Sequence, residues 1–233
     1  MLVYKLTDQK MQTLGGFQWE AGKIREASGD GPLCSKGWLH AYESPPLAVL
    51  HNPIHANIAN PRLFSADTLD GEILRDGMMK LGSTRLVLLE EIPLPQISLT
   101  QRAAYGILCA LEVYREPSFV FWASRWISGE DRSALAAWVA RTAASRSAWT
   151  ASGAARETAS GAAREAASAA AAAAGAAREA ASRSAWTAAR AGAWAATAAA
   201  DAAWAAARAA DAAASAMKYR LDIKSIAEVA MTY

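Results

Sequence analysis

The reactive side chains of this sequence are concentrated in residues 33–43, which read LCSKGWLHAYE. Cys34, His40, Tyr42 and Glu43 could together supply a nucleophile, a general base and a carboxylate. His40 with Glu43 would suit acid–base catalysis, and Cys34 with His40 would suit nucleophilic catalysis. Nearness along the chain does not establish catalytic geometry. We therefore predict structural roles on a strand, assign no catalytic residue, and keep His40 and Glu43 as candidates only.

A second candidate segment is residues 16–23, GFQWEAGK. In a strand, Phe17 and Trp19 would face one side, and Gln18 and Glu20 the other. This pattern is typical of a half-buried strand, and it could also form an aromatic and polar wall for a planar ligand. The predicted ligand-binding set joins this wall to the first segment: Gln18, Trp19, Glu20, Lys23, His40 and Tyr42.

A metal site is not predicted. His51 and His55 have the spacing of two ligands on one helix face, but Pro53 lies between them and no third ligand follows at a fixed spacing. Cys34 and Cys109 form no CxxC pair, and two cysteines in 233 residues fit a reducing compartment. No motif indicates a cofactor.

Composition restricts the partners. The chain has 24 basic and 22 acidic side chains and a formal net charge of +2, too near neutral for a protein that binds a phosphate backbone. The first ten residues, MLVYKLTDQK, lack the basic-then-apolar run of a secretory signal, and no apolar stretch is long enough to span a bilayer. We expect a cytoplasmic protein with neither a nucleic-acid nor a membrane partner.

All eight prolines precede residue 118, which predicts a turn-rich first domain followed by uninterrupted helix. In that first domain, Ser44 would cap a short helix over residues 46–51. Asp70-Gly71 and Asp76-Gly77 have the composition of hairpin turns. The predicted strands are residues 2–6, 16–20, 38–42, 62–67, 72–75 and 85–92. These elements predict a small α+β head domain over residues 1–97.

Two amphipathic helices are expected to connect this head to the rest, over residues 98–129. Thr100 would cap the first, which runs to Tyr114, and residues 118–127 would form an aromatic-rich second helix. Residues 218–233 restore ordinary core side chains and predict a closing helix that returns to the 100–114 helix.

Alanine is about every other residue in the intervening arm, residues 130–217, which predicts helix because alanine has the highest helix propensity. Glycines at 153, 161, 175 and 192 could mark turns of a hairpin or bundle. Alternatively, one long helix could pair in an oligomer through its alanine face. The tryptophans of the arm need burial, so we favour antiparallel helices packed on each other or on a second chain. The predicted class is α+β, a strand-rich N-terminal domain followed by an all-α, alanine-rich arm or bundle.

Residues 1–92 resemble an uncharacterised domain family of phages and bacteria. The resemblance rests on GFQWEAGK at residues 16–23, Leu33-Cys34, GWLHA at residues 37–41 and the prolines that follow. The family pattern is G-F-Q-(Y/W)-E-x-G-K, then L-C-x-x-G-x-H, then a proline and a short helix; here Leu39 lengthens the interval before the histidine by one. The resemblance implies no activity. It implies a phage setting and an alanine-rich helical tail.

The functional prediction is a non-enzymatic binding protein. If the chain is phage-encoded, it would act in the host cytoplasm as a counter-defence factor. It would sequester a small nucleotide-like ligand or block a host protein, and it would form a homo-oligomer through its alanine-rich helices. Two alternatives stay open: an enzyme acting on a nucleotide or phosphoester through His40 and Glu43, and a purely structural scaffold.

Overall fold

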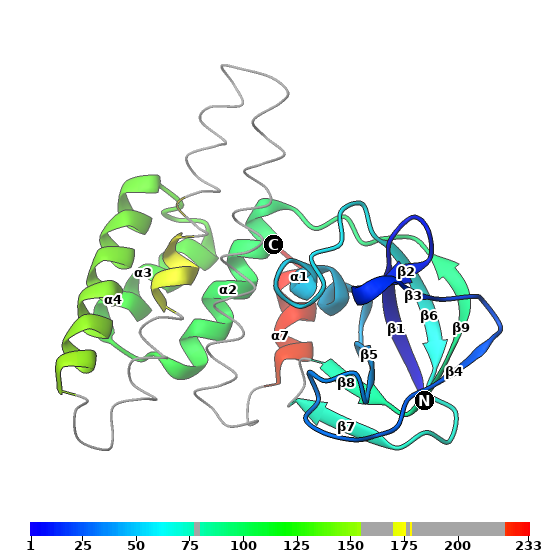
Figure 1. The fold of residues 1–233 in the computed structure, drawn as a ribbon. Helices are drawn as coiled ribbons and strands as arrows, with labels where there is room; N and C mark the ends of the chain where they lie inside the picture. Colours follow the sequence, from blue (N-terminus) through cyan, green and yellow to red (C-terminus); the bar gives the residue numbers. More distant parts are fainter. Residues whose placement is uncertain (77–79, 155–169, 176–177, 179–221) are drawn as a thin grey trace. The chain divides into compact units, whose positions relative to one another are not determined.

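The computed structural model describes residues 1–76, 80–154, 170–175, 178 and 222–233. These residues form two compact units, Met1–Gln96 and Ile97–Tyr233, and each is described by itself (Figure 1). Strands are the main regular elements of the first unit, and the regular elements described in the second are helices. The predicted α+β class is confirmed.

The first unit is built on a four-stranded antiparallel sheet in the order β1-β6-β9-β4. Alternation of apolar and polar residues gives each long strand one face for the core. Val3 lies opposite Ala66, and Lys5 lies opposite Phe64. The strands are β1 Leu2–Thr7, β4 Ile24–Glu26, β6 Arg62–Asp67 and β9 Arg85–Ile92. Three of them match predicted strands, and β4 was not predicted.

A second antiparallel sheet has the order β5-β8-β7, and a small hairpin pairs β2 with β3. The predicted strand over residues 16–20 is wrong in length, because only Phe17–Gln18 pair as β3 and the backbone turns at the positive-φ Gly15 and Gly16 before it. The elements are β2 Gln12–Thr13, the short 3-10 helix η1 Leu14–Gly16, β3, β5 Leu39–Ala41, β7 Ile73–Asp76 and β8 Lys80–Ser83.

The two larger sheets are connected at both ends, once by a backbone bridge and once by the chain itself. Tyr4 in β1 and Tyr42 after β5 exchange two backbone hydrogen bonds, of 2.8 and 2.9 Å. At the other side, β8 runs into β9 through Thr84 alone. The enclosed core contains Val3, Trp19, Leu39, Ala41, Phe64, Ala66, Leu81, Leu86 and Leu88. On the other face of the β5-β8-β7 sheet, Gly82 allows Leu33 and Trp38 to pack closely, since a Cβ there would lie 2.5 Å from Leu33 and 2.7 Å from Trp38.

Helix α1 spans Pro45–His55 and covers the outer side of β1. Ser44 caps it, as predicted, by accepting a hydrogen bond from an amide of the first turn. The prediction that this helix ends at residue 51 is wrong. Pro53 lies inside it, close enough to the end that only one backbone hydrogen bond is forfeited before Ala56 closes the last turn on Asn52. His51 and His55 therefore lie one turn apart on the same helix.

The second unit contains helices α2 Leu99–Val113, α3 Pro117–Ser128, α4 Ala134–Ala154 and α7 Ile223–Ala230. The cap of α2 is Ser98, not Thr100, because Gln101 completes a reciprocal capping box with Ser98. Helix α7 packs on α2, and the Gln101 side chain donates to the Met231 carbonyl at 2.8 Å.

Most of the alanine-rich arm lies outside the described residues. Helix α4 and the helical residues 170–175 and 178 agree with the predicted helix where the arm is described. The choice between a long helix and a hairpin or bundle falls on residues outside this part of the chain and stays a prediction.

Candidate functional site

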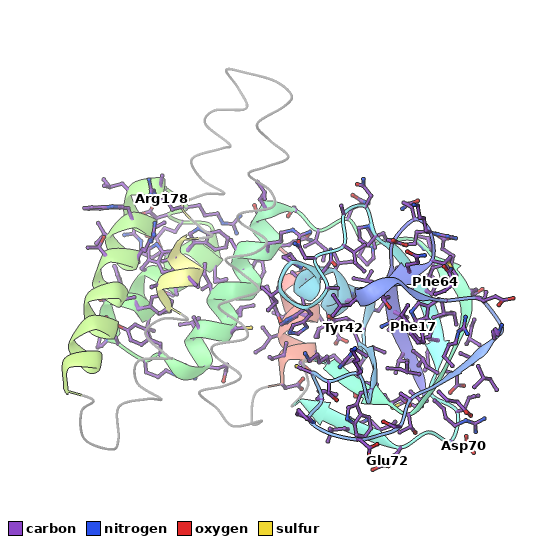
Figure 2. The ribbon with its side chains drawn as sticks, in the orientation of Figure 1. Phe17, Tyr42, Phe64, Asp70, Glu72 and Arg178 are labelled. Atoms are coloured by element: carbon purple, nitrogen blue, oxygen red, sulfur yellow. The ribbon has the colours of Figure 1, made fainter. Side chains whose placement is uncertain are left out.

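All three histidines of the chain lie in the first unit, on β5 and α1. Alternation along β5 turns Ala41 into the core, so His40 and Tyr42 lie on the opposite side of the strand. That is the side on which α1 lies; Figure 2 labels Tyr42 there. The Tyr42 hydroxyl is 3.0 Å from His55 Nδ1, and the rings of His51 and His55 stack with centroids 4.9 Å apart.

Lys80 adds a positive charge to this group. His40 pairs with Gly82 across β5 and β8, so Lys80, two residues before Gly82, lies on the same face of the sheet as His40. The Lys80 ammonium donates to Cys34 Sγ at 3.1 Å. An acidic residue, Asp76, is the ladder partner of Lys80 across β7 and β8. We call His40, Tyr42, His51, His55 and Lys80 the histidine cluster.

The histidines of the cluster are neutral at pH 7. Burial, with help from the charge of Lys80 and from His40, lowers the pKa of His55 to about 3. Burial, His55 and Lys80 hold the pKa of His51 well below its usual range. Burial lowers the pKa of His40 as well; the Leu33 carbonyl opposes this shift, whereas Lys5 and Lys80 add to it. The cluster therefore combines a cation with uncharged imidazoles.

Hydrogen bonding assigns the tautomers of two rings. Burial raises the pKa of Tyr42, so its phenol keeps its proton, and we assign that O–H as the donor to His55 Nδ1. His55 then carries its own hydrogen on Nε2. His40 Nε2 bonds the Leu33 carbonyl, which can only accept, so His40 carries its hydrogen on Nε2 and a lone pair on Nδ1.

Glu43 has a different partner from His40. Its carboxylate accepts from Arg75 Nε at 3.1 Å, an ion pair that ties the end of β5 to β7. Within the described residues, no hydrogen bond or ion pair links Glu43 to a histidine. Acid–base catalysis by His40 and Glu43 stays a prediction. In the structure, His40 bonds the Leu33 carbonyl and Glu43 bonds Arg75.

The predicted wall at residues 16–23 lies partly in the core. Trp19 is only 2% exposed, and its indole N–H donates to Thr13 Oγ at 3.0 Å. The Gln18 carboxamide bonds Lys10 and Trp19 carbonyls within its own hairpin. Glu20 and Lys23 form an exposed ion pair of 3.2 Å. Of the predicted ligand residues, His40 and Tyr42 fall in the histidine cluster, and the other four lie around this hairpin.

Sequence reasoning missed a buried lysine. Lys5 is 9% exposed; its ammonium lies 5.1 Å from the centre of the Trp19 ring and donates to the His40 carbonyl at 2.6 Å. Burial lowers the pKa of Lys5 to about 8. The one signal in the sequence was a lysine at a core-facing position of an otherwise apolar strand, between Val3 and Thr7. Lys5 and Lys80 both contribute positive potential at His40.

The second unit has an open groove of about 430 Å³ between α3 and α4. Its lining is mostly apolar and includes Phe121, Trp122, Leu135 and Val139. The charged Arg125 on its wall is held by Glu130 at 2.9 Å. This groove offers apolar surface and no group arranged for acid–base or nucleophilic chemistry.

Over the described ranges, no set of three or more histidine, cysteine or acidic side chains is arranged to hold a metal ion. In the same ranges, no helix has the length and apolarity needed to cross a bilayer.

The first unit is thus a small antiparallel β domain with one covering helix and a face that carries three imidazoles and Lys80. Residues 1–100 match the model of a family described as Domain of unknown function (DUF7666). The expectation that the first part of the chain resembles an uncharacterised domain family is confirmed. No curated protein and no solved structure matches the chain.

Proposed function

We propose that the chain is a non-enzymatic binding protein that captures a small phosphate-bearing, nucleotide-like ligand at the histidine cluster. The observation that carries the proposal is that Lys80 and His40 lie on one face of the sheet, beside Tyr42 and the stacked rings of His51 and His55, and that the charge of Lys80 lowers the pKa of all three histidines. A cation next to neutral polar rings favours an anion, because the charge attracts it and the rings can hydrogen-bond to it.

Two groups of the cluster can donate hydrogen bonds to an anion. With the tautomers assigned above, His55 Nε2–H and the Lys80 ammonium can both donate, whereas His40 presents a lone pair at Nδ1. Phosphate oxygens accept hydrogen bonds from such groups, and charge-assisted bonds of this kind are about twice as strong as neutral ones.

Binding without turnover is favoured over catalysis because the predicted acid, Glu43, is engaged elsewhere. An imidazole that acts as a general base is usually oriented by an acid, and Glu43 is held by Arg75 instead. The enzyme alternative predicts that product forms and that His40→Gln abolishes it.

The proposal extends to assembly and to setting. Leu135 and Val139 on α4 are 70% and 54% exposed, and apolar surface at such positions supports association of the helical unit with a second copy. For a phage-encoded chain, capture of a nucleotide signal in the host cytoplasm would act as counter-defence; blocking of a host protein is the alternative outcome.

The test is equilibrium binding of nucleoside mono-, di- and triphosphates to the purified chain, with mass spectrometry of the ligand afterwards. Lys80→Met should weaken binding at least about tenfold, since a lost charge-assisted hydrogen bond is worth about 1.5–3 kcal/mol. Lys23→Met is the matched control, because Lys23 is an exposed lysine already paired with Glu20. Equal losses in both variants, or conversion of the ligand to product, would contradict the proposal.

A further inference from the structure

The loop before β5 holds an exposed thiol against a lysine. The Lys80 ammonium on β8 donates to Cys34 Sγ at 3.1 Å, and Cys34 is exposed. The second cysteine of the chain, Cys109, is buried, and burial raises the pKa of its thiol, so that thiol keeps its proton. An oxidant in solution therefore reaches Cys34, where a lysine nitrogen is already in contact with the sulfur.

The packing of this loop keeps the two side chains together. Immediately before Cys34, Leu33 is buried and lies against Gly82 on β8. Immediately after it, the amide and the hydroxyl of Ser35 donate to two carbonyls of the same loop, at 2.9 and 3.0 Å. The backbone on both sides of Cys34 is therefore fixed beside the strand that carries Lys80.

We infer that Cys34 and Lys80 form an oxidative modification site, at which hydrogen peroxide joins Cys34 Sγ to Lys80 Nζ through one oxygen atom. The thiol, the ammonium and two peroxide molecules give the S–O–N bridge, three water molecules and one proton. One S–H and two N–H bonds break, and one S–O and one O–N bond form. Sulfur and nitrogen each lose two electrons, and each peroxide gains two. One oxygen spans most of the 3.1 Å gap, whereas a direct S–N bond would require the two atoms to close it.

The bridge changes the charge of the histidine cluster, and this consequence rests on the proposed function. The bridged nitrogen is an O-substituted hydroxylamine, which is a weak base and carries no charge at pH 7. The bridge thus removes the Lys80 charge, which opposes protonation of all three histidines. Asp76, the ladder partner of Lys80 on β7, keeps its place and loses its cationic neighbour. Oxidation therefore weakens the attraction for an anion, and reduction restores it.

Intact-mass spectrometry and peptide mapping of the full chain test the bridge without any ligand. After mild peroxide treatment, the mass should rise by one oxygen and fall by two hydrogens, and trypsin should release a crosslinked peptide that contains Cys34 and Lys80. Dithiothreitol should reverse both changes. Cys34→Ser and Lys80→Arg should each abolish the crosslink. Lys36→Arg is the matched control and should retain it, because Lys36 is closer to Cys34 in sequence but is exposed.

Nucleotide affinity is the second readout. The oxidised chain should bind nucleoside phosphates at least about tenfold more weakly than the reduced chain, the loss expected for Lys80→Met, and peroxide-treated Cys34→Ser should keep its affinity. Oxidation of Cys34 to a sulfenic or sulfinic acid with Lys80 still cleaved by trypsin, or a crosslink without the oxygen, would overturn this inference and leave the proposed function standing. A bridge in a chain with no measurable anion affinity would support the modification site and count against the proposed function.

Discussion

Acid should destabilise the first unit through its buried neutral histidines. Burial and Lys80 lower the pKa of His55 to about 3 in the folded chain, against an ordinary value of 6.5. Between these two values the unfolded chain binds more protons than the folded one. Stability is therefore fully present above pH 6.5 and is lost as the pH falls toward 3.

The magnitude follows from the two pKa values. His55 has a folded pKa of about 3 and an unfolded pKa of 6.5. At pH 5 this difference lowers the free energy of unfolding by about 2 kcal/mol, and the full loss near pH 3 approaches about 5 kcal/mol. Because the pKa of His51 is also lowered, by burial and by His55, its titration adds to the loss in the same direction.

Hydrogen exchange of the β6 and β9 amides measures this stability for the first unit alone. After correction for the intrinsic pH dependence of exchange, the opening equilibrium should rise at least about 30-fold between pH 7 and pH 5, the equivalent of 2 kcal/mol. His55→Asn should remove a large part of the increase, since asparagine can accept from Tyr42 but does not titrate. Identical opening equilibria at the two pH values would refute the assignment of buried, neutral histidines.

Three further predictions concern single side chains. Burial lowers the pKa of Lys5 from 10.5 to about 8, so at pH 7 Lys5→Met should stabilise the first unit by roughly 3 kcal/mol in urea titrations. That gain should vanish above about pH 10, because the lowered pKa of Lys5 makes the wild type more stable as the pH rises from 8 to 10.5. A Lys5→Met variant less stable than the wild type at pH 7 would contradict this prediction. Gly82→Ala places a Cβ 2.7 Å from Trp38 and should cost about 1–3 kcal/mol in thermal unfolding, so an unchanged midpoint would disprove the close packing. Leu135→Glu should lower the molar mass measured by light scattering, and an unchanged mass would argue against association through α4.

The sequence was most informative where pattern and burial agree. The strand over residues 62–67 and the one over residues 85–92 were predicted at their observed bounds, because apolar residues and flanking turns mark both. Strand β8 was missed, since its sequence KLGS is short and contains a glycine. That glycine is present for packing against Trp38, a tertiary reason that local propensity cannot express.

The site was predicted less completely than the fold. His40 and Tyr42 were chosen for their chemistry, and they do lie together on one side of β5. Lys80 was not predicted, because its place beside the histidines depends on pairing of β5 with β8 across forty residues of chain. His55 was discounted because Pro53 was expected to break the helix, whereas the helix continues past it and stacks His55 on His51.

Nitrogen NMR of histidine-labelled chain tests the central claim most directly, because the three histidines give three pairs of ring signals. The account predicts neutral rings before ligand is added, with the hydrogen on Nε2 in His40 and in His55. Addition of a nucleoside monophosphate should shift the His55 Nε2 signal. The contradicting result is three unchanged histidines under conditions in which the chain binds the anion.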